Sequence, residues 1–380
     1  MNPHAPSLTD AERAPWLAEA RRAATVLTSG GLAILPTETV SGAMVRADRP
    51  GAVALLASAI GQQGSPPSLG ATLHLPDPNA LLRLLRAAHG GDPPVPHARI
   101  VDRLLPGPVR VLIEADPNGL ARMCAYLALV PGAAEVDGML AIRVPRHPVC
   151  TSILELAGQT PIVGVASTAL AAQTDEQLQA AWSNQGGFFR VRTDGAVRAT
   201  GIASTTVVLT SAGGVRVASE GALPAAEVWR ALERRVLFVC TGNTCRSPMA
   251  EAIARRIVSE AEAGPIRTVI ESAGTTGGGG GGATPEAIEA MRGRGMDISH
   301  HISRTLTREM AERADAIFVM TQRHARAVES IAPTTKGRIR TVDPDGRDVE
   351  DPIGRPGSEY ERVAGALESM IRARLATLDA

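Results

Sequence analysis

The sequence predicts an α/β protein of two successive domains, of which the second contains a doubly wound parallel sheet. The chain has 380 residues, and at about 150 residues per domain this length favours two domains. Short apolar runs alternate with Ala- and Leu-rich segments of helical length along the chain, which is the pattern of strands joined by helices. Hydrophobic residues make up 44% of the sequence, which is enough for two ordinary cores.

The first domain is expected at residues 15–230 and the second at residues 231–380. Residues 1–14 are polar and interrupted by prolines, so we expect them to form a disordered tail. Strands and helices alternate regularly in the second domain, which indicates a parallel sheet with right-handed crossovers. Ligands of such sheets bind at the carboxyl ends of the strands.

In the first domain, residues 17–31 are expected to form a helix that ends at Gly30 and Gly31, and residues 32–36 a strand. Short β-branched runs predict the later strands, and Gly- and Pro-rich stretches predict loops. The later strands are expected at 139–145, 160–167, 204–210 and 214–219, loops at 61–70 and 89–100, and a helix at 225–235.

In the second domain, a buried strand is expected at residues 236–240 and a helix at 248–264, with Pro248 in its first turn. The same criteria predict the elements that follow. These are strands at 268–274 and 314–320, helices at 284–295, 321–331 and 358–378, and a flexible glycine loop at 277–282.

Composition excludes several classes of function. The formal net charge is zero, which argues against capture of nucleic acid or an anionic membrane by bulk charge. Aromatic residues are scarce at 2%, which disfavours base-stacking platforms. Lys336 is the single lysine, so any reaction that depends on a lysine side chain is excluded before residue 336. With four cysteines, no secretory signal and no long apolar run, we expect a soluble cytoplasmic protein without a membrane partner.

The strongest chemical signal is the segment VLFVCTGNTCRSPMAEA, a strand followed by a short loop and a helix start. A loop of this length can turn successive N–H groups inward around a phosphate, and the helix start adds the positive end of its dipole. Arg246 can bind two phosphoryl oxygens. The same positive field favours the thiolate of Cys240, which is the nucleophilic form.

Residues around Cys240 and Arg246 complete a candidate phosphate-transfer site. The loop between them contains small, polar or turn-tolerant residues, as a tight anion-binding loop requires. Ser247 would donate a hydrogen bond to the sulfur, and Asp351 is the candidate general acid. The plainer alternatives are a buried cysteine at a strand end and a turn aspartate before Pro352. No His and Cys cluster has ligand spacing, so we expect no metal and no cofactor. The loop residues are Thr241, Gly242, Asn243, Thr244 and Cys245.

Residues 234–380 resemble the low-molecular-weight protein-tyrosine-phosphatase family. The loop carries this resemblance, together with SAGT, DISHHISR, ADAIFVM and EDPIG further along. The resemblance implies that Cys240 attacks phosphorus, that Arg246 stabilises the transferred group, and that Asp351 protonates the leaving group and then activates water. It also implies loop-shaping roles for Asn243, Ser247, Ser272 and His301, although a plain surface position is the alternative for His301.

The substrate expected from this resemblance is a phosphorylated protein. Phosphotyrosine-directed members place aromatic residues after the Asp-Pro pair, whereas here Ile353 and Gly354 follow Pro352. Thr244 stands where those members usually have an aliphatic residue. The CTGNTCRS segment resembles the bacterial arginine-phosphatase branch, so phosphoarginine is the favoured substrate and phosphotyrosine the alternative.

Cys245 follows Cys240 by five residues. In related phosphatases such a pair forms a reversible disulfide that protects the nucleophile from overoxidation, so the resemblance implies this role for Cys245. The alternative is a small residue packed in the loop.

Residues 15–230 resemble the YrdC-like threonylcarbamoyl-adenylate synthase family, whose fold is a twisted open α/β sheet with an electropositive cleft. The segments LPTETVSG, LLPGPVR, LAIRVPRHP, GVAST and ASTTVVL carry this resemblance. It implies ATP, threonine and RNA, including double-stranded RNA, as candidate ligands. The matching cleft positions are Thr37, Arg143, Ser167, Ser204 and Thr205.

The departures from this family are substantial. Ser41 replaces a tyrosine, the uncharged segment 61–70 replaces one that contains lysine and arginine, Ala169 replaces an asparagine, and the arginine expected near the end of the domain is replaced around Ser219. Since a triphosphate needs compensating cations, we expect a domain that lacks synthase activity but still binds nucleotide, threonine or RNA. An active synthase, which would make the protein bifunctional, and a structural or scaffold role are the alternatives.

Overall fold

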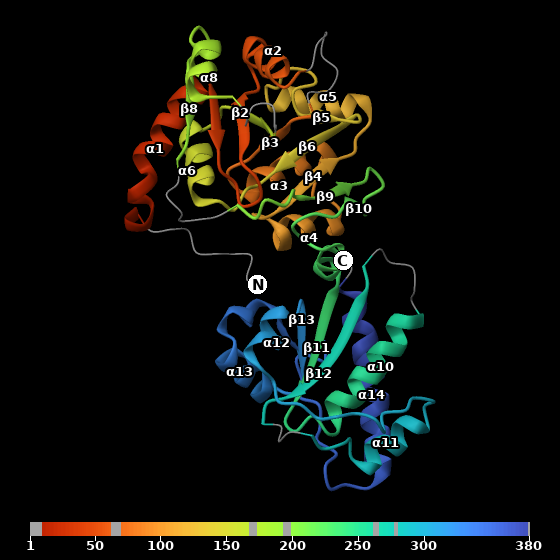
Figure 1. Ribbon diagram of the computed structural model, residues 1–380. Coiled ribbons are helices and arrows are strands. Elements are labelled where there is room, and N and C mark those ends of the chain that lie inside the picture. The colour runs from red at the N-terminus through yellow and green to blue at the C-terminus, as the bar shows by residue number, and fades with distance from the viewer. Residues whose placement is uncertain are drawn as a thin grey trace. The chain divides into compact units, whose positions relative to one another are not determined.

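The computed structural model describes residues 10–61, 70–166, 173–192, 199–260, 266–276 and 280–378. The chain divides into two compact units between Leu232 and Glu233, and each is described separately. Both are mixed α/β units, as the sequence predicted (Figure 1).

The described part of the N-terminal unit contains one mixed sheet of ten strands. Parallel pairs occur between β9 and β4, β6 and β3, and β1 and β8, and the other pairs are antiparallel. The order is β10 (Val215–Ser219), β9 (Thr205–Leu209), β4 (Val109–Ile113), β6 (Met139–Arg143), β3 (Thr72–His74), β7 (Ile162–Val165), β2 (Gly42–Arg46), β1 (Leu32–Leu35) and β8 (Phe188–Arg190), with β5 (Glu135–Val136) paired to β6.

Helices cover both faces of this sheet. Along β1, Leu32 and Ile34 belong to one core cluster and Ala33 and Leu35 to the other, because successive side chains of a strand point to opposite faces. A strand buried on both faces reads as a continuous apolar run. One cluster includes α1 (Asp10–Thr28) and α6 (Pro148–Ala157); the other includes α2 (Pro50–Ala59), α3 (Pro78–His89), α4 (Val95–Leu104), α5 (Pro117–Tyr126), α8 (Asp175–Trp182) and α9 (Ala225–Leu232).

The C-terminal unit contains a parallel sheet of four strands among its described residues. The order is β12 (Thr268–Gly274), β11 (Arg234–Cys240), β13 (Ala316–Val319) and β14 (Ile339–Thr341). Since β12 lies on one side of β11 and β13 on the other, the carboxyl end of β11 is a topological switch point, where ligands of such sheets bind. Cys240 is the last residue of β11.

Helices lie on both faces of this second sheet, as a doubly wound fold requires (Figure 1). Val236 and Phe238 of β11 pack towards one set of helices, and Leu237 and Val239 towards the other. The first set is α10 (Arg246–Glu260), α11 (Pro285–Arg292) and α14 (Gly357–Ala376); the second is α12 (Arg308–Arg313) and α13 (Gln322–Ile331), followed by the 3-10 helix η1 (Pro333–Arg338).

Several predicted boundaries were wrong. Helix α1 begins at Asp10, inside the predicted disordered tail, because Ala11, Glu12, Arg13 and Ala14 are helix formers that extend it across Pro15. Within the predicted loop at 89–100, α4 begins at Val95, and Pro96 occupies its first turn, where proline is tolerated. Helix α10 likewise begins at Arg246, two positions before Pro248.

Other predicted segments fall partly outside the described residues. These are most of the loop at 61–70, the end of the strand predicted at 160–167, the end of the helix at 248–264, and part of the glycine loop at 277–282.

Candidate functional site

The loop that joins β11 to α10 turns sharply at Asn243, whose φ angle is +58°. Asparagine tolerates this left-handed conformation better than most residues. Gly274, at the end of β12, lies directly behind the loop, and a Cβ there would be 2.6 Å from the carbonyl oxygen of Thr241. The Nε2 atom of His301 lies 2.8 Å from the carbonyl oxygen of Asn243. The loop is therefore tightly packed from behind, which leaves its shape little freedom.

The side chain of Asn243 is fully buried and has one amide orientation that satisfies its partners. The backbone N–H of Arg304 donates to Oδ1 at 2.9 Å, and a backbone N–H can only donate. The Nδ2 group must therefore donate to Ser247 Oγ and Ser272 Oγ, each 2.9 Å away.

This orientation determines the directions in which the hydroxyl groups around Cys240 donate their protons. Ser272 donates to the carboxylate of Glu251, which can only accept. Ser247 accepts from Asn243, so its own proton is free to donate to Cys240 Sγ at 2.9 Å. The backbone N–H of Asn243 donates to the same sulfur at 3.3 Å. Two donors thus point at Sγ, an arrangement that stabilises a thiolate.

Arg246 and Asp351 lie together beside the loop. Arg246 is 4% exposed; its Nη1 donates to Val349 O at 3.0 Å, and its Nη2 donates to Asp351 Oδ2. The Asp351 side chain is 44% exposed, and its other oxygen accepts from the backbone N–H of Ile353. The structure therefore brings Cys240, Arg246 and Asp351 to one end of the sheet, with the carboxyl group of Asp351 open to solvent.

His324 contacts the loop from α13. Its Nε2 lies 2.8 Å from Thr241 Oγ1 and its Nδ1 lies 2.8 Å from Thr321 Oγ1. Burial, followed by the positive charge of Arg246, lowers the pKa of His324 to about 4, so the imidazole is neutral at physiological pH.

Cys245 is buried, and its thiol lies among three hydroxyl groups. Its Sγ lies 3.6 Å from both Thr244 Oγ1 and Thr284 Oγ1, and 3.9 Å from the hydroxyl of Tyr360. All four cysteines are free thiols. The disulfide role of Cys245 stays a prediction.

Ile353, which follows the Asp-Pro pair, is 61% exposed.

Sequence analysis missed Gly274, Glu251 and His324 as parts of this site. Gly274 had a detectable signal, because a glycine at the end of the neighbouring parallel strand lies level with the loop. Glu251 and His324 had none, since their positions depend on how α10 and α13 pack.

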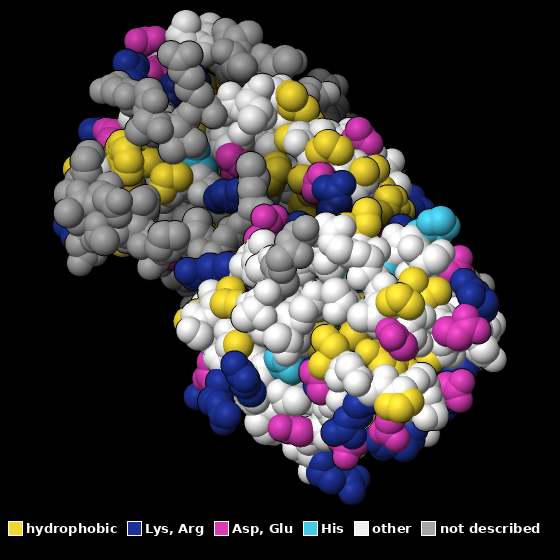
Figure 2. Space-filling model, turned by 90° about the horizontal axis from the view of Figure 1, so that it is seen from below, with side chains coloured by type: hydrophobic (Ala, Val, Ile, Leu, Met, Phe, Trp, Pro, Cys, Tyr) yellow, Lys and Arg dark blue, Asp and Glu magenta, His cyan; other side chains and the backbone are white. Residues whose placement is uncertain are grey.

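On the face drawn in Figure 2, basic and acidic side chains are interspersed, so no surface of a single charge sign is visible there.

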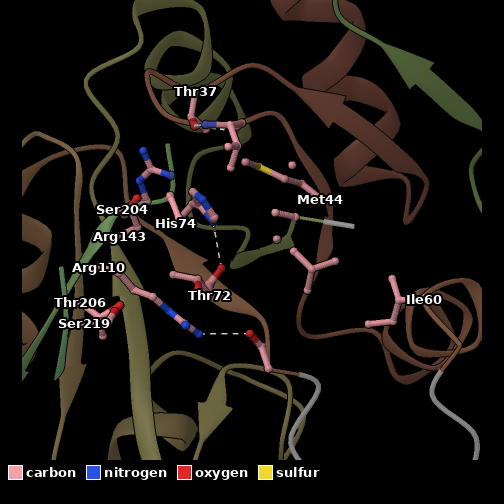
Figure 3. Close-up of a pocket in the computed structure, with 17 residues that line it drawn as sticks. Thr37, Met44, Ile60, Thr72, His74, Arg110, Arg143, Ser204, Thr206 and Ser219 are labelled. Atoms are coloured by element: carbon pink, nitrogen blue, oxygen red, sulfur yellow. Dashed lines mark hydrogen bonds between the residues drawn. The ribbon is translucent and has the colours of Figure 1, made fainter. Parts of the chain in front are cut away.

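The N-terminal unit contains a cavity of about 470 Å³. Of the cleft positions expected from the sequence, Thr37, Arg143 and Ser204 line it (Figure 3). Thr205 does not line it: its hydroxyl donates to Leu223 O and accepts from the backbone N–H groups of Gly221 and Leu223. Its neighbour Thr206 lines the cavity instead, because adjacent strand residues point to opposite faces. Ser167 lies outside the described residues.

Arg110 is a cation of this cavity that the sequence did not reveal. It lies directly opposite Arg143 in the antiparallel pairing of β4 and β6, a like-charge pairing that is unfavourable without a counter-ion. Arg143 donates to Glu38 at 2.9 Å. Arg110 donates to Gly70 O at 3.1 Å (Figure 3). The Nε atoms of both arginines are buried and have no partner among the described residues.

His74 lies beside this arginine pair (Figure 3). Its Nδ1 lies 2.9 Å from Thr72 O. Burial, and then the charge of Arg143, lower its pKa to about 3. The cavity therefore presents two guanidinium groups and a neutral imidazole, a donor-rich wall suited to an oxyanion.

Within the described ranges, no three His, Cys, Asp or Glu side chains gather in a way that could hold a metal ion. None of the described helices combines the length and the apolar character needed to cross a membrane.

A family model matches each of the two units. A family model described as "Low molecular weight phosphotyrosine protein phosphatase" matches residues 235–380. The Sua5/YciO/YrdC model, described as "Telomere recombination", matches residues 25–221.

Individual relatives match the C-terminal unit. A protein named protein-arginine-phosphatase from Bacillus subtilis (strain 168) is 36% identical over 141 residues, which cover 36% of this chain and 91% of that protein. The low molecular weight protein-tyrosine-phosphatase Etp of Escherichia coli (strain K12) is 31% identical over 135 residues, which cover 35% of this chain and 86% of that protein. Among solved structures, a YwlE mutant from Bacillus subtilis has 32% identity and a TM-score of 0.37, with coverage of 39% of this chain and 100% of that one.

Proposed function

The chain belongs to the low molecular weight phosphotyrosine protein phosphatase family over residues 235–380 and to the Sua5/YciO/YrdC family over residues 25–221, and we propose that its C-terminal unit hydrolyses phosphoarginine in proteins through a phosphocysteine at Cys240. Family membership makes this unit a phosphatase of phosphorylated proteins. The phosphoryl acceptor and the type of phosphorylated residue are the parts that we propose.

The observation that carries the proposal is the set of donors around one sulfur. Ser247 and the backbone N–H of Asn243 both point at Cys240 Sγ, while Arg246 and Asp351 lie beside the same loop. A nucleophile, a bidentate cation and an acid are what transfer of a phosphoryl group to cysteine requires.

In the first step, the thiolate of Cys240 attacks phosphorus in line with the leaving group. The S–P bond forms as the bond from phosphorus to the substrate nitrogen breaks. The loop N–H groups and Arg246 stabilise the charge on the equatorial oxygens. Asp351, in its protonated form, gives its proton to the leaving nitrogen of the arginine side chain.

In the second step, Asp351 is a carboxylate and accepts a proton from water. The water oxygen bonds to phosphorus as the S–P bond breaks, inorganic phosphate leaves, and the electron pair returns to Cys240 as a thiolate. Ser247 stabilises that thiolate as it forms, since its hydroxyl already donates to the sulfur. The half-exposed position of Asp351 gives water access to this carboxylate.

Two residues favour phosphoarginine over phosphotyrosine. Thr244 places a hydroxyl in the loop, where it would help to orient a substrate guanidinium for attack on the P–N bond. Ile353 is the side chain after the Asp-Pro pair and is largely exposed, so no aromatic ring stands there to stack on a phosphotyrosine. A relative at 36% identity is named protein-arginine-phosphatase. Phosphotyrosine is the alternative.

The test compares hydrolysis of free phosphoarginine and phosphotyrosine by the full chain and by its Thr244→Ile variant. We expect the wild type to prefer phosphoarginine and the variant to lose that preference. Unchanged arginine-phosphatase activity in the variant contradicts the role of Thr244. Activity in Cys240→Ser contradicts the phosphocysteine, and no activity in the wild type indicates a scaffold protein instead.

For the N-terminal unit, we propose a binding domain without synthase activity whose ligand is a nucleotide. The opposed pair of Arg110 and Arg143 favours this function, because both guanidinium groups border the cavity and, of the two, Glu38 forms an ion pair with Arg143 alone. An active synthase remains the alternative, as does binding of threonine or of double-stranded RNA. A cytoplasmic location stays a prediction from the low cysteine content.

Titration calorimetry with ATP, threonine and a short RNA duplex separates these alternatives. We expect ATP to bind, Arg110→Gln to weaken that binding by about tenfold, the loss of one charged hydrogen bond, and no pyrophosphate to be released. Pyrophosphate release at enzymatic rates would establish the synthase instead, and the absence of any binding would favour a structural domain.

A further inference from the structure

His324, one of two histidines among the described residues that contact the phosphate-binding loop, has no part in the chemistry described above. His324 is 4% exposed and is the third residue of α13, the helix that follows β13. Its backbone N–H donates to Thr321 Oγ1, the cap of that helix, at 3.3 Å. Both ring nitrogens are used: Nδ1 on Thr321 Oγ1 and Nε2 on Thr241 Oγ1, each at 2.8 Å. The ring therefore links a rigid helix start to the loop residue that follows Cys240.

Thr241 begins the turn of the loop and is constrained by its backbone as well. Its carbonyl oxygen accepts from the N–H of Thr276 at 3.0 Å and is the atom that approaches Gly274. Thr241 is otherwise exposed, so without the ring its side chain would be free to rotate. The peptide groups of such a loop must point inward to hold a phosphoryl group.

We propose that His324 is a positioning residue of the phosphatase reaction, which holds Thr241, and through it the start of the phosphate-binding loop, against α13. This rests on the proposed function at Cys240. The inference concerns how the loop is held in shape, and His324 itself does not touch the transferred group.

The charge state of the ring suits this role. The charged groups near it are Arg246, Arg323, Asp351 and Asp348, and the outcome of burial and these charges is a pKa of about 4. A neutral ring has one N–H, so one threonine hydroxyl accepts from it and the other donates to it. A protonated ring would place a second positive charge near Arg246, and repulsion from that guanidinium group disfavours protonation.

The test measures kcat, KM and competitive inhibition by inorganic phosphate for the full chain and for His324→Ala and His324→Gln. We expect the Ala variant to lose at least tenfold in kcat and to bind inorganic phosphate more weakly. The Gln variant, whose amide has a donor and an acceptor, should stay within about threefold of wild type, as expected for a restored hydrogen bond. His300→Ala, which removes an exposed histidine, is the control for unrelated effects and should leave kcat unchanged.

A double-mutant cycle with Thr241→Val shows whether the contact itself matters. We expect Thr241→Val to have an effect similar to that of His324→Ala and the double variant to be no worse than either. Additive effects, or a Gln variant as defective as the Ala variant, would overturn the proposal. If His324→Ala does not fold, Thr241→Val and His324→Gln decide, and full activity in Thr241→Val overturns it.

The failure of this inference is distinguishable from the failure of the proposed function. If Cys240→Ser is inactive and His324→Ala is as active as wild type, the phosphatase mechanism stands and the positioning role falls. If Cys240→Ser retains activity, the site of phosphoryl transfer is elsewhere, and both fall.

Discussion

Replacing Asn243 by aspartate is the sharpest test of how Cys240 is activated. The two side chains have the same shape, and both tolerate the left-handed backbone found at this position. An aspartate oxygen can still accept from the N–H of Arg304. The other oxygen, however, would face Ser247 Oγ at 2.9 Å as an acceptor where the amide is now a donor. Ser247 would therefore turn its proton to the carboxylate and away from Cys240.

The size of the effect follows from the hydrogen bond that is lost. A hydrogen bond to a charged group contributes about 1.5–3 kcal/mol, which corresponds to a loss of about 10- to 150-fold in rate. The added negative charge near the sulfur acts in the same direction. We therefore expect Asn243→Asp to lower kcat by at least tenfold, and burial of the new carboxylate to lower the melting temperature as well.

Asn243→Gly is the matched control, because glycine accepts the same backbone and removes every side-chain contact. It loses three hydrogen bonds, a cost of about 2–4 kcal/mol in stability, yet it leaves the Ser247 proton on Cys240. The assay is steady-state hydrolysis of a chromogenic phosphate ester, with thermal unfolding measured in parallel. We expect the glycine variant to be more active than the aspartate variant, since it leaves the Ser247 hydroxyl free to donate to Cys240. The reverse order of activity, or additivity of Asn243→Asp with Ser247→Ala, would refute this account of the proton arrangement.

Three further predictions concern packing, thiol reactivity and pH. Gly274→Ala should lower kcat by at least tenfold and cost on the order of 1–3 kcal/mol, because its Cβ would overlap Thr241 O; wild-type kinetics in this variant would show that the loop is not packed as described. Iodoacetamide at neutral pH should inactivate the enzyme without modifying Cys150, because burial raises the pKa of that thiol to about 12; peptide mass mapping of the partly inactivated protein checks this, and labelling of Cys150 first would contradict it. His74 has a pKa of about 3 in the fold, so the N-terminal unit should become less stable as pH falls from about 6.5 towards 3, because the unfolded chain takes up a proton that the folded unit does not. Unfolding followed by tryptophan fluorescence checks this, because all three tryptophans precede residue 233 and so report on this unit. An equal dependence of stability on pH in His74→Gln would exclude His74 as the cause.

Local pattern predicted most elements of the C-terminal unit, although it missed α12 and β14. The strand predicted at 268–274 has the observed bounds, and the strand at 236–240 and the helix at 321–331 differ from β11 and α13 by at most two residues at either end. These segments have caps, breakers and apolar runs that agree with one another, so propensity and packing favour the same structure.

Prediction was poorer in the N-terminal unit. The strands β2, β3 and β4 were missed, because they are short and buried within a mixed sheet. Nearly all of their residues are buried, so they lack the sustained alternation of polar and apolar residues that marks a half-buried strand.

The sequence by itself determined which residues of the phosphatase unit form the candidate phosphate-binding loop. Cys240, Asn243, Arg246 and Ser247 occur in one short segment, and a loop between a strand and a helix start can hold such residues together by local geometry alone. The direction of their hydrogen bonds, the neutral ring of His324 and the packing of Gly274 were decided by the tertiary structure. Those depend on groups that reach the loop from other elements, such as the N–H of Arg304, which orients the Asn243 amide.

The same division applies to the N-terminal cavity. Sequence resemblance identified Arg143 but not Arg110, because the opposition of the two follows from the register of β4 on β6. It also assigned Thr205 to a cleft that Thr206 lines, since a shift of one residue along a strand reverses the face on which a side chain lies. A linear sequence records residue types and their spacing. Register, proton direction and burial arise only when distant segments pack together.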